Sequence, residues 1–391
     1  MTRALMSGNH TAGYALIAAG EANRGARGCC SGVYPITPQT EIIEYLCAAR
    51  LTKGAIVPVE SEHSALNVCI GASINGARSF TASSSNGVLY MAENLFAAAN
   101  YRLPIVMAVS NRTVGPPWNL WADQGDSLAL RDAAWLQFYC ESHQDLADTI
   151  LVAFRVAEDA RILLPAIVAQ DGFLLSHTQM VVDLPEQGLV DRYLPPLELA
   201  HRLDPAHPRA YGGMTWPRDT VKQREEQQAS MDLVPAVLEE ALDEFADVFG
   251  RRPDGALTAE FTEDADTVLV ACTTMVRTAR EVVKRRRAAG EKVGLVKVKL
   301  FRPFLRDQFV QAVGSARRVA VLDRNHAPGS GGIFWTEAAT SLRSRPDIVV
   351  QDYIVGMGGG NVTPADIDGI VDDVQQRGGS DAPVFIREVA V

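Results

Sequence analysis

Long apolar segments are missing from this chain of 391 residues. No stretch reaches the ~18 to 20 consecutive apolar residues that a membrane-spanning helix needs. The N-terminal residues also lack the apolar core of a secretory signal peptide. These two absences predict a cytoplasmic protein that is not inserted into a membrane.

An excess of positive charge is also missing, because the formal net charge is -10. A protein that binds nucleic acid is expected to carry a basic face, so this balance argues against a nucleic-acid partner. The one basic run, residues 284–287, lies late in a predicted helix. We interpret it as a solvated helix end that complements the helix dipole.

The six cysteines show none of the CxxC spacing that is typical of zinc ribbons and iron–sulfur sites. Cys29 and Cys30 stand together in a strand-like segment, which favours buried, reduced thiols. We therefore expect that this chain alone holds no metal cluster and that any such cluster lies elsewhere.

Dinucleotide and P-loop motifs are missing as well. Two glycine-rich turns, at residues 329–332 and 356–360, follow predicted strands. Phe334 and Asn361 stand where G-x-G-x-x-G requires its third glycine, so we do not expect NAD or ATP to bind to this chain. We interpret the glycines as tight turns, at which another chain or a ligand could approach the backbone.

What the sequence does contain is a regular alternation of apolar strands and helices, which predicts an α/β fold with a doubly wound parallel sheet. In the first half, strands are predicted at 28–34, 55–59, 78–83, 104–109 and 165–170, and helices at 12–23, 39–51, 64–74, 88–100 and 146–162. Beyond residue 258 the alternation resumes, with strands at 267–271, 292–300, 318–323, 348–354 and 383–386.

The length suits two domains and a connection. Between residues 185 and 253 the alternation is replaced by proline-rich segments and a charged helix at 219–249. We predict a first domain at 1–190, a connector with the charged helix at 191–258, and a second, smaller α/β domain at 259–391.

Polar clusters follow four strands of the first domain. Because the carboxyl ends of parallel strands meet at one edge, where such folds bind ligands, a carboxylate, a guanidinium and several hydroxyls are expected to converge on one crevice. The clusters are Tyr34-Pro35-Ile36-Thr37-Pro38, Glu60-Ser61-Glu62-His63, the polar run 81–87, and Ser110-Asn111-Arg112.

A long loop, residues 113–126, begins directly after Arg112. We call it the tryptophan loop, because it contains Trp118 and Trp121. Loops longer than ~12 residues are usually functional or disordered, and two tryptophans argue against disorder. We expect this loop to cover the crevice.

These motifs resemble the alpha subunit of 2-oxoacid:acceptor oxidoreductases, of which the pyruvate:ferredoxin oxidoreductases are the best-known members. The resemblance runs in order along nearly the whole chain. It rests on YPITP at 34–38, SE at 61–62, SNR at 110–112, DQGD at 123–126, QDGF at 170–173, LFRPF at 300–304 and GMGGGNVTP at 356–364.

The resemblance implies a pyrimidine-type thiamine-diphosphate-binding domain followed by a transketolase C-terminal-like domain. Thiamine diphosphate would be shared with a beta subunit that holds the diphosphate and Mg²⁺, and 4Fe–4S clusters would lie in beta-, gamma- or delta-type partners. The acyl group would pass to CoA. Electrons would pass to ferredoxin, or to NAD through an FAD-containing, NADH-linked partner. This chain alone is expected to be inactive.

The resemblance also implies a role for Glu62, which matches the glutamate that meets N1′ of the cofactor aminopyrimidine. A carboxyl group there stabilises the imino tautomer of the ring, and burial should raise its pKa so that it keeps a proton. From the residues alone, Glu62 could equally be a surface glutamate at a helix start, where Glu60 is just as well placed.

Arg112 matches the arginine that receives the substrate carboxylate through two parallel donors. The alternative is a loop arginine in a surface ion pair. Thr37 matches the threonine whose hydroxyl joins this arginine at the substrate, and the alternative is a hydroxyl that satisfies local backbone. Pro35 and Ile36 are expected to shape the turn beside the cofactor ring.

Trp118 and Trp121 suggest an apolar pocket for an aryl group such as that of phenylglyoxylate, which we favour slightly over pyruvate or a branched-chain 2-oxoacid. The alternative is that both rings pack the loop or contact a partner chain. Two other functions compete: a non-redox thiamine enzyme, and a non-catalytic docking subunit of an electron-transfer complex.

The remaining polar side chains of these motifs carry weaker signals. Thiamine chemistry supplies its own base, so structural roles are expected for His63 and His177. Asp123 and Asp126 could anchor the loop or face a partner subunit, and the sequence does not decide between these roles.

Overall fold

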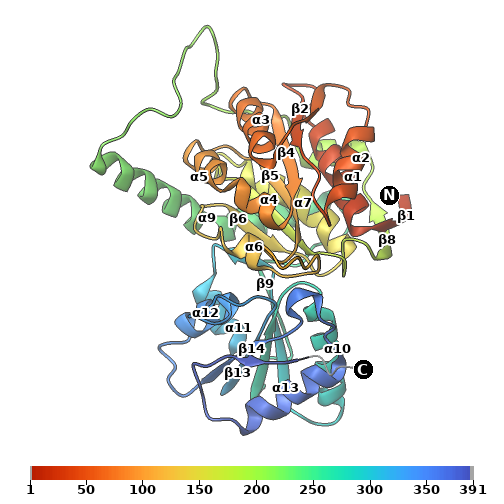
Figure 1. The fold of residues 1–391 in the computed structure, drawn as a ribbon, viewed down its shortest axis with the longest axis vertical. Helices are drawn as coiled ribbons and strands as arrows, with labels where there is room; N and C mark the ends of the chain where they lie inside the picture. The colour runs from red at the N-terminus through yellow and green to blue at the C-terminus, as the bar shows by residue number, and fades with distance from the viewer. Residues whose placement is uncertain (1, 388–391) are drawn as a thin grey trace.

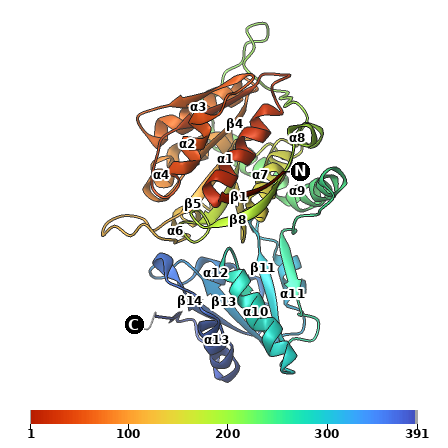
Figure 2. The same cartoon turned by 90° about the vertical axis from the view of Figure 1, so that its right-hand side faces the viewer.

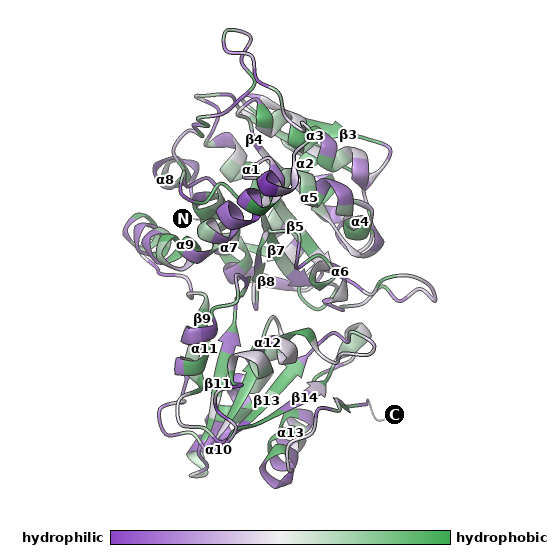
Figure 3. Cartoon of the chain, turned by 90° about the vertical axis from the view of Figure 1, so that its left-hand side faces the viewer, coloured by the Kyte–Doolittle hydropathy of each residue, from purple (hydrophilic) through white to green (hydrophobic). Residues whose placement is uncertain are grey.

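The computed structural model describes residues 2–387 and shows two α/β units, one above the other in Figure 1. The first unit is built on a seven-stranded sheet and the second on a six-stranded sheet. Figure 3 shows that the strands of both sheets are largely apolar, whereas the helices that cover them are more polar outside. This arrangement confirms the predicted α/β class.

The first sheet has the strand order β12-β6-β7-β5-β4-β2-β3. All its neighbours run parallel except β12, which pairs antiparallel with β6. Its strands are β2 (Cys29–Val33), β3 (Gly54–Pro58), β4 (Arg78–Ser83), β5 (Val106–Asn111), β6 (Leu136–Tyr139), β7 (Ala166–Asp171) and β12 (Leu300–Arg302).

Helices cover both faces of this sheet. Val106 and Ala108 of β5 join one core with α1 and α7, whereas Met107 and Val109 join a second core with α3 and α5 on the other face. The helices of this unit are α1 (Gly8–Glu21), α2 (Thr40–Ala48), α3 (Glu62–Ile74), α4 (Ser85–Tyr90), α5 (Ala92–Asn100), α6 (Gly125–Leu128), α7 (His143–Ala157), α8 (Gln187–Tyr193) and the long α9 (Pro217–Phe249).

The second sheet has the order β15-β14-β13-β10-β11-β9. It is parallel except for β9, which runs antiparallel to β11. Its strands are β9 (Leu257–Glu260), β10 (Thr267–Ala271), β11 (Val293–Val298), β13 (Arg318–Asp323), β14 (Val349–Ile354) and β15 (Val384–Phe385). Its helices are α10 (Met275–Ala288), α11 (Arg306–Val313), α12 (Ile333–Ser341), the short η1 (Met357–Gly359) and α13 (Pro364–Gln376).

The two units share a packed boundary. Tyr139 of the first sheet lies against Phe334 of α12, with ring centroids 5.5 Å apart. Lys297 of β11 and Lys299, just after this strand, approach the buried carboxylate of Asp145 in α7 at 3.2 and 2.6 Å. β12 also lies beyond residue 258, yet it joins the first sheet. The domain boundaries at 190 and 258 stay a prediction.

Several predicted elements have different bounds. The helix predicted at 12–23 starts at Gly8, because Ser7 accepts a hydrogen bond from the His10 backbone N–H and caps it. The helix predicted at 88–100 is divided at Met91 into α4 and α5. The antiparallel pair β1 (Thr2–Ser7) and β8 (Gln179–Leu184) was not predicted.

No helix within residues 2–387 combines the length and the apolar character that are needed to cross a lipid bilayer.

Candidate active site

Four neighbouring strands carry the predicted polar clusters. β5, β4, β2 and β3 lie side by side in this order and run parallel. Thr37 follows β2, Glu62 begins α3 after β3, Ser83 ends β4, and Arg112 follows β5. The clusters therefore lie at one edge of the sheet, as the strand pattern predicts.

Glu62 is the first residue of α3, which Ser61 caps by accepting a hydrogen bond from the Ser64 backbone N–H at 3.2 Å. Glu62 is 7% exposed, and burial raises the pKa of its carboxyl group. No cation of the described residues forms a salt bridge with it. A raised pKa favours the protonated carboxyl group that the resemblance requires.

The Arg112 guanidinium is held from three sides. Nη1 donates a hydrogen bond to the Thr37 carbonyl at 2.8 Å and Nε donates to the Asn119 carbonyl at 3.4 Å. The ring centre of Trp118 lies 5.6 Å from Cζ. Burial lowers the pKa of this guanidinium, although the Asp126 carboxylate opposes the shift. The contacts orient the side chain and leave part of its donor fork for another acceptor.

Asp126 is buried and connects the segments around Arg112 by hydrogen bonds. Its Oδ2 accepts hydrogen bonds from the backbone N–H groups of Ser85 at 2.8 Å and Arg112 at 3.0 Å. Its Oδ1 accepts from Asn111 Nδ2 at 2.6 Å and from the Ser127 N–H at 2.8 Å. Burial raises the pKa of Asp126 to about 7, while these donors favour the charged form. Asp126 thereby fixes the backbone from which Arg112 extends.

The turn at residues 34–38 is anchored by two amide side chains. Asn9 Nδ2 and Gln39 Nε2 donate hydrogen bonds to carbonyl groups of this turn at 2.6 and 2.9 Å. Pro35 and Thr37 are exposed and Ile36 is half-buried. Sequence analysis assigned no role in the site to Asn9, because the residue lies far in sequence from the turn that it contacts.

The tryptophan loop projects sideways from the lower edge of the first unit, beside α6 and above the second unit (Figure 2). Trp118 is 64% exposed and lies over Arg112. Trp121 packs edge-on against Phe173, with ring centroids 4.2 Å apart. The two tryptophans therefore have different surroundings, and Trp118 is the one that contacts a predicted site residue.

Both histidines of the motifs lie next to glutamates. His177 Nε2 is 3.0 Å from Glu41 Oε1, and its ring lies against Phe173 at 4.4 Å. His63 Nε2 is 3.8 Å from Glu93 Oε2. These contacts are compatible with the predicted structural roles.

Two family models match this chain. Residues 26–243 match "Pyruvate flavodoxin/ferredoxin oxidoreductase, thiamine diP-bdg", and residues 265–367 match "Pyruvate:ferredoxin oxidoreductase core domain II". The chain belongs to the pyruvate:ferredoxin oxidoreductase family. It is an alpha subunit of a 2-oxoacid oxidoreductase, as its motifs predicted.

Curated relatives match over most of their length. Pyruvate synthase subunit PorA of Methanothermobacter thermautotrophicus is 44% identical over 343 residues, which cover 87% of this chain and 88% of that subunit. Ketoisovalerate oxidoreductase subunit VorA of Pyrococcus abyssi is 40% identical over 380 residues, which cover 95% of this chain and 93% of that subunit.

Solved structures share the fold. A 2-oxoglutarate:ferredoxin oxidoreductase from Magnetococcus marinus aligns with a TM-score of 0.70 at 20% identity, over 95% of this chain and 65% of that chain. A split-gene transketolase aligns with a TM-score of 0.53 at 15% identity, over 95% of this chain and 98% of the other. The second likeness extends over both units and shows a shared fold.

The site has polar groups that fit the pyrimidine side of thiamine diphosphate, the cofactor named by the first family model. Ser83 Oγ is buried and has no hydrogen-bond partner in the part of the chain that the structure describes. Gly87 faces this hydroxyl and Glu62 Oε1, and a Cβ there would lie 2.6 Å from each oxygen. A carboxyl group with a raised pKa, a spare hydroxyl and a glycine beside them suit a polar heteroaromatic ring.

Proposed function

We propose that this chain supplies the substrate-binding arginine and the cofactor-facing glutamate of a CoA-acylating 2-oxoacid oxidoreductase. The complex would convert a 2-oxoacid, CoA and an oxidised acceptor into acyl-CoA, CO₂ and the reduced acceptor. Thr37, Glu62 and Arg112 carry the part of this reaction that belongs to the alpha subunit.

The proposal rests on one observation, that Arg112 is buried and has no carboxylate of the described residues close to its guanidinium. This side chain is 5% exposed, and no carboxylate within residues 2–387 lies at salt-bridge distance from its guanidinium. A buried charge that has no opposite charge at salt-bridge distance is costly, and a bound anion offsets that cost. A carboxylate is the anion whose two oxygens match the parallel donors of a guanidinium.

Glu62 completes the proposal on the cofactor side. Thiamine diphosphate, when bound, supplies the carbanion chemistry on which decarboxylation of a 2-oxoacid depends. The role of Glu62 is to hold a proton on its carboxyl group toward the pyrimidine, which the raised pKa favours. Pro35 and Ile36 lie in the turn that precedes Thr37 and would face the same ring.

The substrate is proposed to be a small aliphatic 2-oxoacid. The two relatives described above are named for pyruvate and ketoisovalerate, and neither name supports the aryl preference suggested by the sequence. Trp121 is engaged with Phe173, which leaves Trp118 as the aromatic side chain beside Arg112. This contact keeps phenylglyoxylate as a second candidate, and both can be tested in one assay.

Other subunits are required by this proposal. Within residues 2–387 there is no group of three or more histidine, cysteine, aspartate or glutamate side chains that could hold a metal ion. We assign Mg²⁺ and the diphosphate to a beta subunit and the iron–sulfur clusters to the partner subunits. Ferredoxin is the proposed acceptor, and NAD would replace it if a flavin-containing partner is present.

The test uses the complex that co-purifies with this chain, under anoxic conditions. CoA-dependent viologen reduction is measured with pyruvate, 2-oxoisovalerate, phenylglyoxylate and 2-oxoglutarate. Glu62→Gln is expected to lower turnover by about 100-fold or more, since a positioned proton-transfer group contributes about that much. Glu60→Gln is the matched control, because Glu60 is an exposed glutamate two residues before Glu62.

Assembly and thiamine diphosphate content are measured for both variants. Full turnover by a correctly assembled Glu62→Gln complex would contradict the assignment of Glu62. Arg112→Lys is expected to raise the KM for the 2-oxoacid, because lysine cannot offer two parallel donors.

A further inference from the structure

The tryptophan loop is folded around one side chain, that of Asn119. Asn119 Oδ1 accepts a hydrogen bond from the Trp121 backbone N–H at 2.8 Å. The Asn119 backbone carbonyl accepts from the Thr113 hydroxyl and from Arg112 Nε. A hydrogen bond from the Thr113 N–H to the Trp121 carbonyl, at 3.3 Å, closes this part of the loop.

The same side chain reaches the second unit. Asn119 Nδ2 donates a hydrogen bond to the Gly358 carbonyl at 3.0 Å, across 239 positions of sequence. Next to it, the Gly359 backbone N–H donates to the Ala122 carbonyl at 2.8 Å. The loop of the first unit therefore has two hydrogen bonds to the glycine turn of the second.

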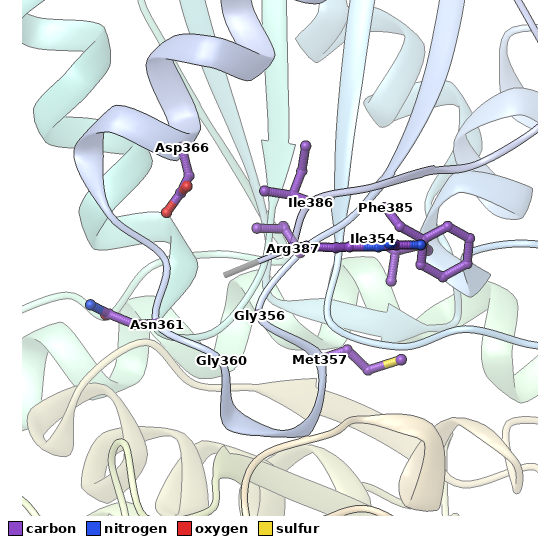
Figure 4. Close-up of a pocket in the computed structure, with 10 residues that line it drawn as sticks. Ile354, Gly356, Met357, Gly360, Asn361, Asp366, Phe385, Ile386 and Arg387 are labelled. Carbon is purple, nitrogen blue, oxygen red and sulfur yellow. The ribbon is translucent and has the colours of Figure 1, made fainter. Parts of the chain in front are cut away.

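The turn from Gly356 to Gly360 allows this approach because it carries no side chains at the contact. A Cβ on Gly359 would lie 2.1 Å from the Trp121 Cβ, and Gly358 and Gly359 have φ angles of +69° and +83°. Figure 4 shows this turn. The turn borders a 470 Å³ cavity that lies at the carboxyl ends of β14 and β15.

These contacts extend to Arg112, the proposed substrate-binding residue. The Arg112 guanidinium donates to two carbonyls, of Thr37 at 2.8 Å and of Asn119 at 3.4 Å. The first carbonyl belongs to the turn after β2 and the second to the tryptophan loop. The direction of the free donors of Arg112 thus depends on where the Asn119 carbonyl is held.

We propose that Asn119 is a positioning residue for 2-oxoacid binding. Its side-chain amide docks on Gly358 and thereby fixes the carbonyl that orients Arg112, so the second unit sets the geometry of the substrate-binding arginine. This inference rests on the proposed function of Arg112. It predicts that Asn119 affects binding of the 2-oxoacid more than any other step.

The experiment compares Asn119→Ala with wild type in the complete co-purified complex. The KM for the 2-oxoacid is expected to rise about tenfold, the size expected when a hydrogen bond that orients a charged group is lost. The kcat, the KM for CoA and the thiamine diphosphate content are expected to stay near wild type. Gly359→Ala, which displaces the loop from the other side, is expected to raise the same KM.

Leu120→Ala is the matched control, since Leu120 is the next residue of the loop and is 40% exposed. It is expected to leave all these constants unchanged. A purely structural role of Asn119 would lower assembly or kcat and leave the KM for the 2-oxoacid unchanged. That result, or a wild-type KM in an assembled Asn119→Ala complex, would overturn the inference.

A double-mutant cycle separates this inference from the proposed function. If Asn119 acts through Arg112, Asn119→Ala is expected to have no further effect on KM in an Arg112→Ala background. Full additivity of the two changes would refute the positioning role. If Arg112→Ala alone leaves KM unchanged, the proposed function of Arg112 fails, and the positioning role, which depends on it, fails with it.

Discussion

Replacing Asp352 with asparagine is expected to stabilise the second unit, and to do so more at pH 8 than at pH 4.5. Asp352 in β14 and Asp323 at the end of β13 are both fully buried. A Cβ on Gly332 would lie 2.1 Å from Asp323 Oδ2 and 2.7 Å from Asp352 Oδ1, so the two carboxyl groups face each other across this glycine.

The hydrogen bonds decide which of the two groups carries a proton. Asp323 accepts from Asn325 Nδ2 and from the backbone N–H groups of Phe334 and Trp335, so it is favoured as the charged partner. Asp352 accepts from the Gly332 N–H through Oδ2, whereas its Oδ1 has no partner in the described part of the chain. Burial raises the pKa of both groups.

The magnitude follows from the raised pKa of Asp352, which burial brings to about 6. Relative to an ordinary aspartate pKa near 4, this corresponds to about 3 kcal/mol, at about 1.4 kcal/mol per pKa unit. A carboxyl group with a raised pKa contributes stability below its unfolded pKa near 4, and this contribution is lost as the pH rises through the folded pKa. An asparagine amide donates to Asp323 at every pH and avoids that loss.

The assay is urea unfolding of the purified chain at pH 4.5 and pH 8, for wild type, Asp352→Asn and the exposed control Asp381→Asn. The gain in free energy of unfolding of Asp352→Asn over wild type is expected to be larger at pH 8 by about 1 to 3 kcal/mol. An equal gain at both pH values, or a less stable variant at pH 8, would refute the assignment of the proton to Asp352.

Two further predictions concern buried charges of the first unit. Arg78 donates hydrogen bonds to both carboxylate oxygens of Glu158 at 2.6 Å. Arg78→Met leaves this buried carboxylate unpaired. It is therefore expected to lower the free energy of unfolding, measured in urea, by about 3 to 5 kcal/mol. Burial alone would raise the pKa of Asp145, but Lys299 and Lys297 hold it well below its usual range. The stability from this group is present above its unfolded pKa near 4 and is lost as the pH falls below that value. Asp145→Asn is therefore expected to destabilise at pH 7, with melting temperatures of variant and wild type converging in acid.

Much of the fold could be predicted from local pattern. β4, β10 and β13 have the predicted bounds, and β10 and β13 are mainly apolar runs between clear turn signals. β6 and β12 were missed as separate strands, since they have four and three residues and their pairing joins distant segments. A short strand of this kind is defined by its neighbours in the sheet and not by its own periodicity.

The candidate site also has features that could be predicted from the sequence and features that could not. The positions of Thr37, Glu62 and Arg112 could be predicted, because a polar residue after a buried parallel strand lies at the ligand-binding edge. The contact of Asn119 with Gly358 could not, because nothing near either residue in the sequence marks the other. The glycine turn was expected to meet a ligand or another chain, and the structure brings a loop of the same chain to it.

The antiparallel pairing of β12 with β6 has a consequence for biosynthesis. β6 ends at Tyr139 and β12 begins at Leu300, so the ribosome must add the intervening residues before this edge of the first sheet can be closed. At about 5 to 20 residues per second, that takes about 10 to 30 s. During this interval the nascent subunit exposes an unpaired strand edge of a kind that invites aggregation. A chain released before residue 302 would leave the ribosome with that edge still open.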